Sequence, residues 1–188
     1  MKKVILFDFF GVISSEVAPK WFARYFDDAE AKRIKNEVMA PGDRGERDED
    51  EIYDDVARIC SVERGYVIDE WQKLAKIDEK VVEYIKTLRK DHPVYLLSNA
   101  VDTFLKTIIY KNNIQDLFDM IFISSELRLA KPDPAFFIHC LSAIGASPSE
   151  CVMIDDNPKN IASAESVGIS GIVYTGLEDL KKRIEEIN

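Results

Sequence analysis

The chain has 188 residues, of which 46% are apolar and 31% are charged, a profile typical of a globular protein that buries a real core. Its formal net charge of -9 disfavours a nucleic-acid-binding face, which needs clustered Lys and Arg, but allows a locally positive site for a small phosphorylated ligand. No apolar run approaches the ~18 residues of a membrane span.

Five apolar runs predict the strands of a buried parallel sheet. The first run, Val4 to Phe10, is interrupted only by Asp8. Continuous runs of this kind are typical of strands that are covered on both faces. The four later runs are Val94 to Leu97, Met120 to Ile123, Val152 to Ile154 and Gly171 to Tyr174.

Helical patterns lie between the later runs. Residues 80–90, 103–110 and 133–144 each place apolar side chains on one face. Asp133 and Pro134 are typical of a helix start, and Gly145 is typical of its end. This alternation of strands and helices predicts an α/β core, a doubly wound and Rossmann-like parallel sheet.

Residues 15–77 interrupt the alternation. They contain no strand-like run, they are rich in charged residues, and their amphipathic stretches lie around residues 21–26, 31–39 and 51–60. Residues 41–50 are polar and turn-like. We therefore predict a small helical cap at residues 15–77, inserted into a core made of residues 1–14 and 78–188.

Polar side chains at the ends of the predicted strands indicate a phosphoryl-transfer site, because ligands bind beyond the carboxyl ends of open parallel sheets. Three carboxylates there suit Mg²⁺, and the hydroxyl, amide and ammonium groups suit phosphoryl oxygens. A carboxylate that faces a neutralised phosphoryl group can act as a nucleophile and form an aspartyl-phosphate. These residues are Asp8, Ser98, Asn99, Lys131, Asp155 and Asp156.

The same residues belong to four motifs in which the chain resembles the haloacid dehalogenase-like (HAD) hydrolases. One motif alone occurs by chance, but the set in this order is specific, and the predicted cap lies where that family has one. The motifs are Asp8-Phe9-Phe10-Gly11-Val12, Val94-Tyr95-Leu96-Leu97-Ser98-Asn99, Lys131-Pro132-Asp133-Pro134 and Val152-Met153-Ile154-Asp155-Asp156-Asn157.

The resemblance implies a role for each of these residues. Asp8 is the nucleophile and, with the Phe10 carbonyl, a Mg²⁺ ligand. Asp156 binds the metal directly, and Asp155 binds it largely through water. The phosphoryl oxygens are held by Ser98, Asn99 and Lys131, and Lys131 is also catalytic.

Phe10 departs from the family pattern. HAD phosphatases usually carry Asp at this position, where it protonates the leaving group and then activates water. Phenylalanine can do neither, and general acid–base help is typically worth ~10²–10⁴ in rate. The resemblance therefore implies a phosphatase that is slow, prefers good leaving groups, or borrows an acid–base group from the cap or the substrate.

Three hypotheses of function remain open. The first is Mg²⁺-dependent hydrolysis of a small phosphomonoester, and the chain is loosely similar to a glucose-1-phosphatase-like subgroup whose first motif also lacks the second Asp. The second is a phospho-ligand-binding or regulatory protein with little turnover, suggested by Phe10. The third is a 2-haloacid dehalogenase, since these enzymes often carry an aromatic residue here, although they usually lack paired acids such as Asp155 and Asp156.

The three cysteines, Cys60, Cys140 and Cys151, have no paired or metal-binding spacing. We read them as reduced thiols and expect a cytoplasmic protein without a signal peptide. The expected partner is a small phosphorylated metabolite rather than a nucleic acid or a membrane, and the chain is expected to be a monomer or a homodimer.

Overall fold

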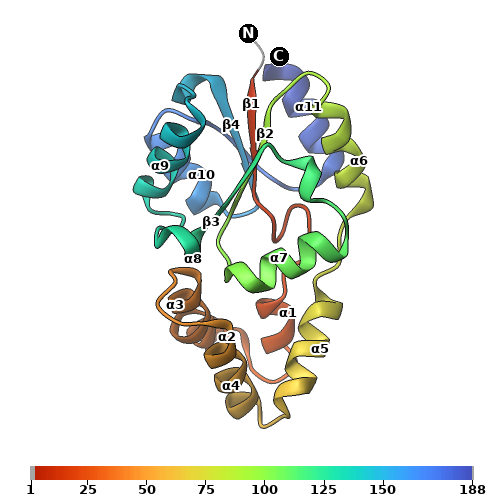
Figure 1. Cartoon of the computed structure of the whole chain (residues 1–188), viewed down its shortest axis with the longest axis vertical. Helices are drawn as coiled ribbons and strands as arrows, with labels where there is room; N and C mark the ends of the chain where they lie inside the picture. Colours follow the sequence, from red (N-terminus) through yellow and green to blue (C-terminus); the bar gives the residue numbers. More distant parts are fainter. Residues whose placement is uncertain (1–2, 188) are drawn as a thin grey trace.

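Five parallel strands form the centre of the structure, a computed structural model that describes residues 3–187. Their order in the sheet is β3-β2-β1-β4-β5. The first strand is central because it pairs with β2 on one side and β4 on the other (Figure 1). The strands are β1 (Val4–Phe7), β2 (Val94–Ser98), β3 (Met120–Ile123), β4 (Cys151–Asp155) and β5 (Ser170–Val173).

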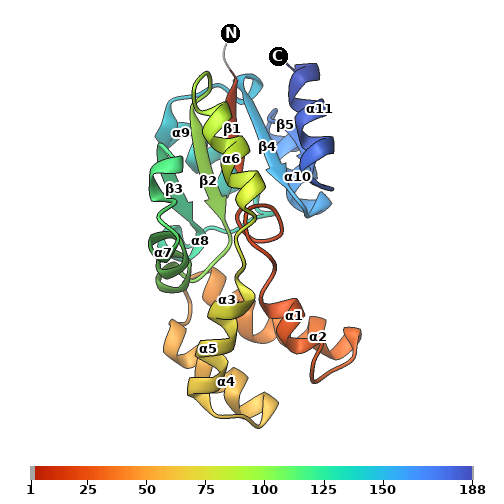
Figure 2. The same cartoon turned by 90° about the vertical axis from the view of Figure 1, so that its right-hand side faces the viewer.

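Helices cover both faces of this sheet (Figure 2), because alternate side chains of a strand point to opposite faces. Ile5 and Phe7 belong to one apolar cluster with α6 (Glu79–Leu88), α7 (Asp102–Lys111) and α11 (Leu177–Ile187). Leu6 belongs to a second cluster with α9 (Pro134–Ile144) and α10 (Pro158–Ser166). Short helical segments complete the core: η2 (Gln115–Leu117), α8 (Ser124–Leu127) and η3 (Pro148–Glu150).

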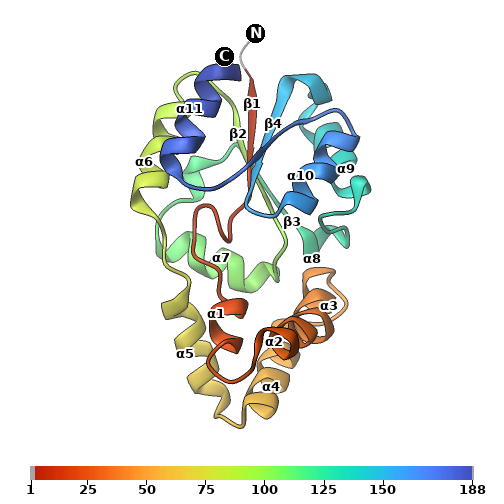
Figure 3. The same ribbon diagram turned by 180° about the vertical axis from the view of Figure 1, so that it is seen from behind.

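The segment between β1 and α6 is helical and lies beyond the carboxyl ends of the strands (Figure 3). Its buried Trp21 and Trp71 belong to the same apolar cluster as Phe7 of β1. The helices are α1 (Ala18–Phe22), α2 (Asp28–Ile34), the π-helix η1 (Lys35–Met39), α3 (Ala40–Asp43), α4 (Glu49–Cys60) and α5 (Arg64–Leu74).

The predicted fold class is confirmed, and the five predicted strands all form. The predicted helix start at Asp133 is also confirmed, since its side chain accepts a hydrogen bond from the Ala135 N–H and Gly145 closes the helix at φ +68°. The boundaries of the core and cap stay predictions, and residues 1 and 2 of the predicted core lie outside the described residues. No helix within residues 3–187 combines the length and apolar character needed to cross a bilayer.

The turn-like character predicted for residues 41–50 was wrong at both ends, and α4 already begins at Glu49. Residues 40–43 form α3, which continues directly from η1, and the Arg44 N–H donates to the Ala40 carbonyl at 3.2 Å. The helices α5 and α11 were not predicted.

Candidate active site

Asp8 lies at the carboxyl end of the central strand. Its backbone N–H donates to the Ile154 carbonyl at 2.9 Å, which extends the pairing of β1 and β4 by one residue. Its Oδ1 accepts a hydrogen bond of 2.7 Å from the Phe9 N–H. Only 8% of Asp8 is exposed, so a central strand presents one nearly buried carboxylate at the edge where ligands bind.

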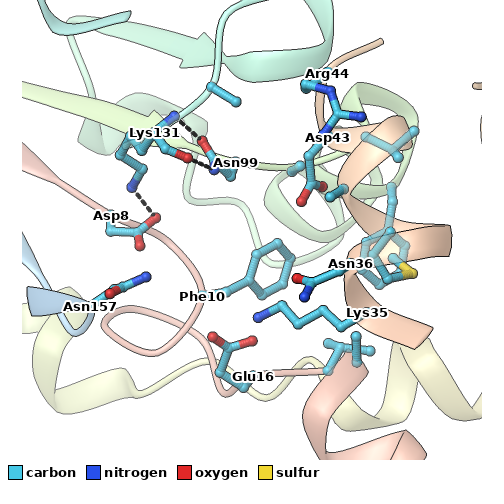
Figure 4. Close-up of a pocket in the computed structure, with 18 of the residues that line it drawn as sticks. Asp8, Phe10, Glu16, Lys35, Asn36, Asp43, Arg44, Asn99, Lys131 and Asn157 are labelled. Carbon is cyan, nitrogen blue, oxygen red and sulfur yellow. Dashed lines mark hydrogen bonds and ion pairs between the residues drawn. The ribbon is translucent and has the colours of Figure 1, made fainter. Parts of the chain in front are cut away.

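Lys131 joins two of the predicted acids, of which Figure 4 shows Asp8. Its Nζ lies 2.9 Å from Asp8 Oδ1 and 2.7 Å from Asp155 Oδ2, and these side chains are almost inaccessible to solvent. Burial alone would lower the pKa of Lys131, but the charges of Asp8 and Asp155 outweigh it and raise that pKa. The lysine is therefore a fixed cation inside the site.

Asn99 holds the backbone of the lysine in place. Its Nδ2 donates to the Lys131 carbonyl at 2.7 Å, and its Oδ1 accepts from the Lys131 N–H at 2.9 Å. The residue after β2 is thus locked to the loop after β3, although 32 residues separate them. In this structure Asn99 positions Lys131 and also lines the cavity described below.

Asp155 is fully buried, and its oxygens are occupied by protein donors. Asn160 Nδ2 lies 3.0 Å from both carboxylate oxygens, and the Asn157 N–H donates to Oδ1 at 2.9 Å. Together with Lys131 these donors satisfy the hydrogen-bonding capacity of the buried carboxylate. Asp155 orients the lysine and the start of α10, an arrangement compatible with contact to a metal through water.

Three carboxylates come together as a possible cation site. Asp8, Asp155 and Asp156 each offer an oxygen, and these oxygens lie within 4.8 Å of one another. Burial first, and then the charge of Asp155, raise the pKa of Asp8 well above its usual range, against the opposing effect of Lys131. Burial, followed by the charges of Glu16 and Asp155, raises the pKa of Asp156 to about 6. A hard divalent cation such as Mg²⁺ fits this oxygen set and would offset its charge.

Ser98 supplies an unpaired donor at the end of β2. The residue is fully buried, and its Oγ has no hydrogen-bond partner among residues 3–187. Buried hydroxyl groups almost always have a partner, so an orphaned one next to Asn99 fits a ligand oxygen. The structure therefore brings five of the predicted side chains to one place, with Ser98 as the sixth, immediately before Asn99 in the chain.

A cavity of about 500 Å³ separates this group from the cap helices. Asp8, Asn99, Lys131 and Asp156 line its core wall, and Ser98 and Asp155 are fully buried. The cap wall contains polar residues that no sequence motif marks, because only docking of the cap onto the core brings them near Asp8. They are Lys35, Asn36, Asp43, Arg44 and Glu49.

Phe10 faces the same cavity. Its ring stacks on Phe104 of α7 with centroids 6.1 Å apart and an angle of 13° between the rings. Trp71 and Tyr53 continue the aromatic contacts into the cap, with centroids 6.0 Å from Trp71 to Phe104 and 5.6 Å from Tyr53 to Trp71. The position that carries Asp in the family pattern is here part of an apolar wall.

Known proteins are similar to the chain in sequence and in fold. The chain is 27% identical over 161 residues to drimenol cyclase drtB of Aspergillus calidoustus, an alignment that covers 82% of this chain and 30% of that protein. It is 26% identical over 186 residues to D-ribitol-5-phosphate phosphatase of Bacteroides thetaiotaomicron, with 89% of each covered. The chain spans between 30% and 40% of the length of the first curated relatives it matches.

A solved structure is also similar to the chain. A HAD family enzyme of Bacteroides thetaiotaomicron, in complex with magnesium and inorganic phosphate, superimposes with a TM-score of 0.77 at 26% identity, over 92% of this chain and 93% of that chain. The family model for haloacid dehalogenase-like hydrolases matches residues 2–168. The match covers most of the sequence and includes all four motifs, and the chain therefore belongs to the haloacid dehalogenase-like hydrolases.

Proposed function

We propose that the protein is a Mg²⁺-dependent phosphatase that hydrolyses a small phosphomonoester through an aspartyl-phosphate on Asp8. The observation that carries this proposal is the triad of Asp8, Asp155 and Asp156 around the fixed cation of Lys131. Two relatives described above support it, one named for its activity on D-ribitol 5-phosphate and one solved with magnesium and phosphate. The expected setting is the cytoplasm, with a small phosphorylated metabolite as partner.

Each side chain of the core wall has a place in this proposal. Asp8 and Asp156, with the carbonyl of Phe10, would hold Mg²⁺ directly, and Asp155 would contact it through water. The metal would offset the negative charge of the phosphoryl group during transfer. Lys131 and the Ser98 hydroxyl would donate to the phosphoryl oxygens, and Asn99 would contribute its amide and fix Lys131.

The proposed reaction has two displacements at phosphorus. Asp8 Oδ attacks the phosphorus, the bond to the leaving oxygen breaks, and the alcohol departs with a proton. Water then attacks the same phosphorus, the bond to Asp8 breaks, and inorganic phosphate leaves. Lys131 stabilises the charge on the phosphoryl oxygens in both steps, since a buried ammonium group interacts strongly with developing charge.

The first test is release of phosphate from p-nitrophenyl phosphate, with and without Mg²⁺. This ester has a good leaving group, so the lack of a carboxylate at Phe10 matters least. Turnover should require Mg²⁺ and should fall at least ~10³-fold in Asp8→Asn, because the amide cannot act as the nucleophile. An unchanged rate in Asp8→Asn would sink the mechanism.

Phe10 favours a second candidate, a protein that binds a phosphorylated ligand with little turnover. The cavity and the buried donors serve binding as well as catalysis, and the apolar wall offers no acid at position 10. The discriminating variant is Phe10→Asp. If it creates phosphatase activity that the parent lacks, the parent is a binder, whereas activity in the parent excludes that role.

A further inference from the structure

The proposed phosphatase reaction lacks a proton donor at residue 10, and the cavity shows which groups could replace it. Five acidic side chains other than Asp8 line the cavity. Three of them have other tasks: Asp156 belongs to the cation site, Glu49 accepts a hydrogen bond of 2.7 Å from Tyr53, and Asp133 caps α9 through Ala135. Glu16 and Asp43 remain.

Asp43 is the better placed of the two. In Figure 4 its carboxylate lies on the cap wall, on the other side of the cavity from Asp8, with the ring of Phe10 between the two walls. The leaving oxygen departs on the side of the phosphorus opposite the Asp8 nucleophile, and that side faces the cap. Glu16 instead follows the β1 turn on the same side of the cavity as the cation site, and its charge acts on Asp156.

The helix that carries Asp43 is fixed against the core. Gly42 is buried, and a Cβ added to it would lie 2.2 Å from Ile52 Cδ1 and 3.1 Å from Val101 Cγ2. The next residue, Arg44, forms a two-pronged pair with Glu46 at 2.6 and 2.8 Å. The backbone on one side of Asp43 is thus packed tightly, Arg44 is directed to Glu46, and the Asp43 carboxylate forms no ion pair within residues 3–187.

We propose that Asp43 is the general acid and base of this active site, supplied by the cap in place of the residue that Phe10 excludes. This inference rests on the proposed phosphatase function and adds a catalytic residue to it. The cap, with Gly42 of α3 packed against Ile52 of α4 and against Val101, would then be required for chemistry as well as for binding.

The proton balance of the two steps follows from this role. In the first step the Asp43 carboxylic acid gives its proton to the leaving oxygen as the bond from phosphorus to that oxygen breaks, and an alcohol is released. In the second step the Asp43 carboxylate takes a proton from the attacking water as the new bond to phosphorus forms and the bond to Asp8 breaks. Asp43 is then protonated again, and no other donor or acceptor is consumed.

The electrostatic surroundings suit both steps. Burial raises the pKa of Asp43 to about 7, and the charge of Glu16, in the loop after β1, adds to this effect. Lys35 of η1, Arg44 of α3 and Lys131 of the core wall act in the opposite direction. A catalytic group works best when its pKa lies near the operating pH, because both protonation states are then accessible.

The test compares leaving groups. p-Nitrophenyl phosphate needs little protonation of its leaving oxygen, and n-propyl phosphate needs full protonation. Asp43→Asn should lower kcat/KM for n-propyl phosphate by ~10²–10⁴-fold and for p-nitrophenyl phosphate by less than ~10-fold. With the aryl ester the variant should also release a rapid burst of one p-nitrophenolate per active site, because the aspartyl-phosphate forms but its hydrolysis lacks a base.

The matched control is Glu16→Gln, which removes the other unassigned carboxylate of the cavity and should change both rates equally, by only a few-fold. A double variant, Phe10→Asp with Asp43→Asn, should recover part of the n-propyl phosphate activity, since it restores an acid at the position that the family uses. That recovery would also show that Asp43→Asn is folded.

Three results would overturn the proposal. Equal losses for the two esters in Asp43→Asn would make Asp43 a structural residue. A loss in Glu16→Gln that depends on the leaving group would transfer the role to Glu16. If the parent hydrolyses neither ester, the proposed phosphatase function fails, and the role of Asp43 fails with it. If the parent is active, either of the first two results contradicts only the role of Asp43 and leaves the phosphatase function intact.

Discussion

The two walls of the cavity hold their acidic side chains in different ways. On the core wall, Asp8 and Asp155 contact one buried ammonium group, and Asp155 has two further donors from Asn157 and Asn160. On the cap wall, Asp43 forms no ion pair within residues 3–187, since Arg44 pairs with Glu46, and the cations Lys35, Arg44 and Lys131 act on it only as neighbouring charges. On the core wall a buried ammonium group opposes the effect of burial on the pKa of Asp8, and on the cap wall no ion pair within residues 3–187 opposes it at Asp43.

This contrast matches the two chemical tasks of the proposed reaction. A nucleophile must be anionic, and Lys131 together with a bound cation favours the anionic form of Asp8. A proton donor must be neutral at working pH, and a carboxyl group in a poorly solvated cavity stays protonated to higher pH. The same residue type thus serves opposite roles because its surroundings differ.

The largest expected effect comes from removing the built-in counter-charge of the core wall. Lys131→Met leaves two buried carboxylates, Asp8 and Asp155, without their shared partner. Breaking a buried ion pair from one side typically costs 3–5 kcal/mol, so we expect a loss of about that size in the free energy of unfolding. Urea denaturation at pH 7.5 without metal would measure it, and added Mg²⁺ should restore part of the loss.

Lys106→Met is the matched control for this change. Lys106 also lies between two carboxylates, Asp102 and Glu126, but all three side chains are on the surface. Exposed pairs contribute about 0–1 kcal/mol because water screens them. Equal losses in the two lysine variants would contradict the idea that the core wall depends on a buried cation.

The core could be predicted from the sequence because each strand carries its own signal. A strand covered on both faces is a continuous apolar run, and the parallel sheet then places the residue after each run at one edge. Asp8 and Asp155 could be named as site residues for this reason, before any contact was known. Parallel pairing of β1 with its neighbours was enough to bring these strand ends together.

The cap wall could not be predicted in the same way. Its helices are short, and Asp43 lies in a Pro-Gly-Asp sequence that is typical of a turn. Its place in the cavity depends on the contacts of Gly42 with Ile52 and Val101, which join segments far apart in the chain. A charged residue in a polar stretch usually faces solvent, and only the docked structure distinguishes Asp43 from the others.

A smaller effect is expected at the turn that follows the nucleophile. Gly11 has φ +85°, and a Cβ there would lie 2.3 Å from Asp156 Oδ2. Gly11→Ala should lower the free energy of unfolding by about 2 kcal/mol, since a strained backbone position costs of order 1–3 kcal/mol. It should also displace Asp156 and weaken Mg²⁺ binding, measured by isothermal titration calorimetry, by about tenfold, equivalent to ~1.4 kcal/mol.

Gly145→Ala separates backbone strain from displacement of the carboxylate. Gly145 closes α9 at φ +68°, and nothing lies within 4 Å of an added Cβ. This variant should lose stability to a comparable or smaller extent while Mg²⁺ affinity stays at the parent value. Equal Mg²⁺ affinities in the two alanine variants would show that Asp156 is not held by the Gly11 turn.

The smallest expected effect, on the cap wall, has the opposite sign. Asp43 has a pKa of about 7 in the folded protein, against ~3.9 in an unfolded chain, so folding retains a proton that the unfolded chain releases. The parent therefore loses stability as pH rises from about 4 to 7, and the deficit stays constant at higher pH. Asp43→Asn removes this deficit, and the variant should be more stable than the parent at pH 8.

The gain should be about 1–2 kcal/mol in total. Each unit of pKa shift corresponds to ~1.4 kcal/mol for a fully desolvated group, and the gain per unit is smaller here because the half-buried carboxylate is partly solvated in the cavity. Urea denaturation of both proteins without metal at pH 8 and at pH 4.5 would measure it, and the difference should shrink at the lower pH, where Asp43 is protonated in the folded protein. A variant that is less stable than the parent at pH 8 would mean that the Asp43 carboxylate is anionic and stabilises the cap. The two walls would then hold negative charge alike, and the contrast between nucleophile and proton donor would fail.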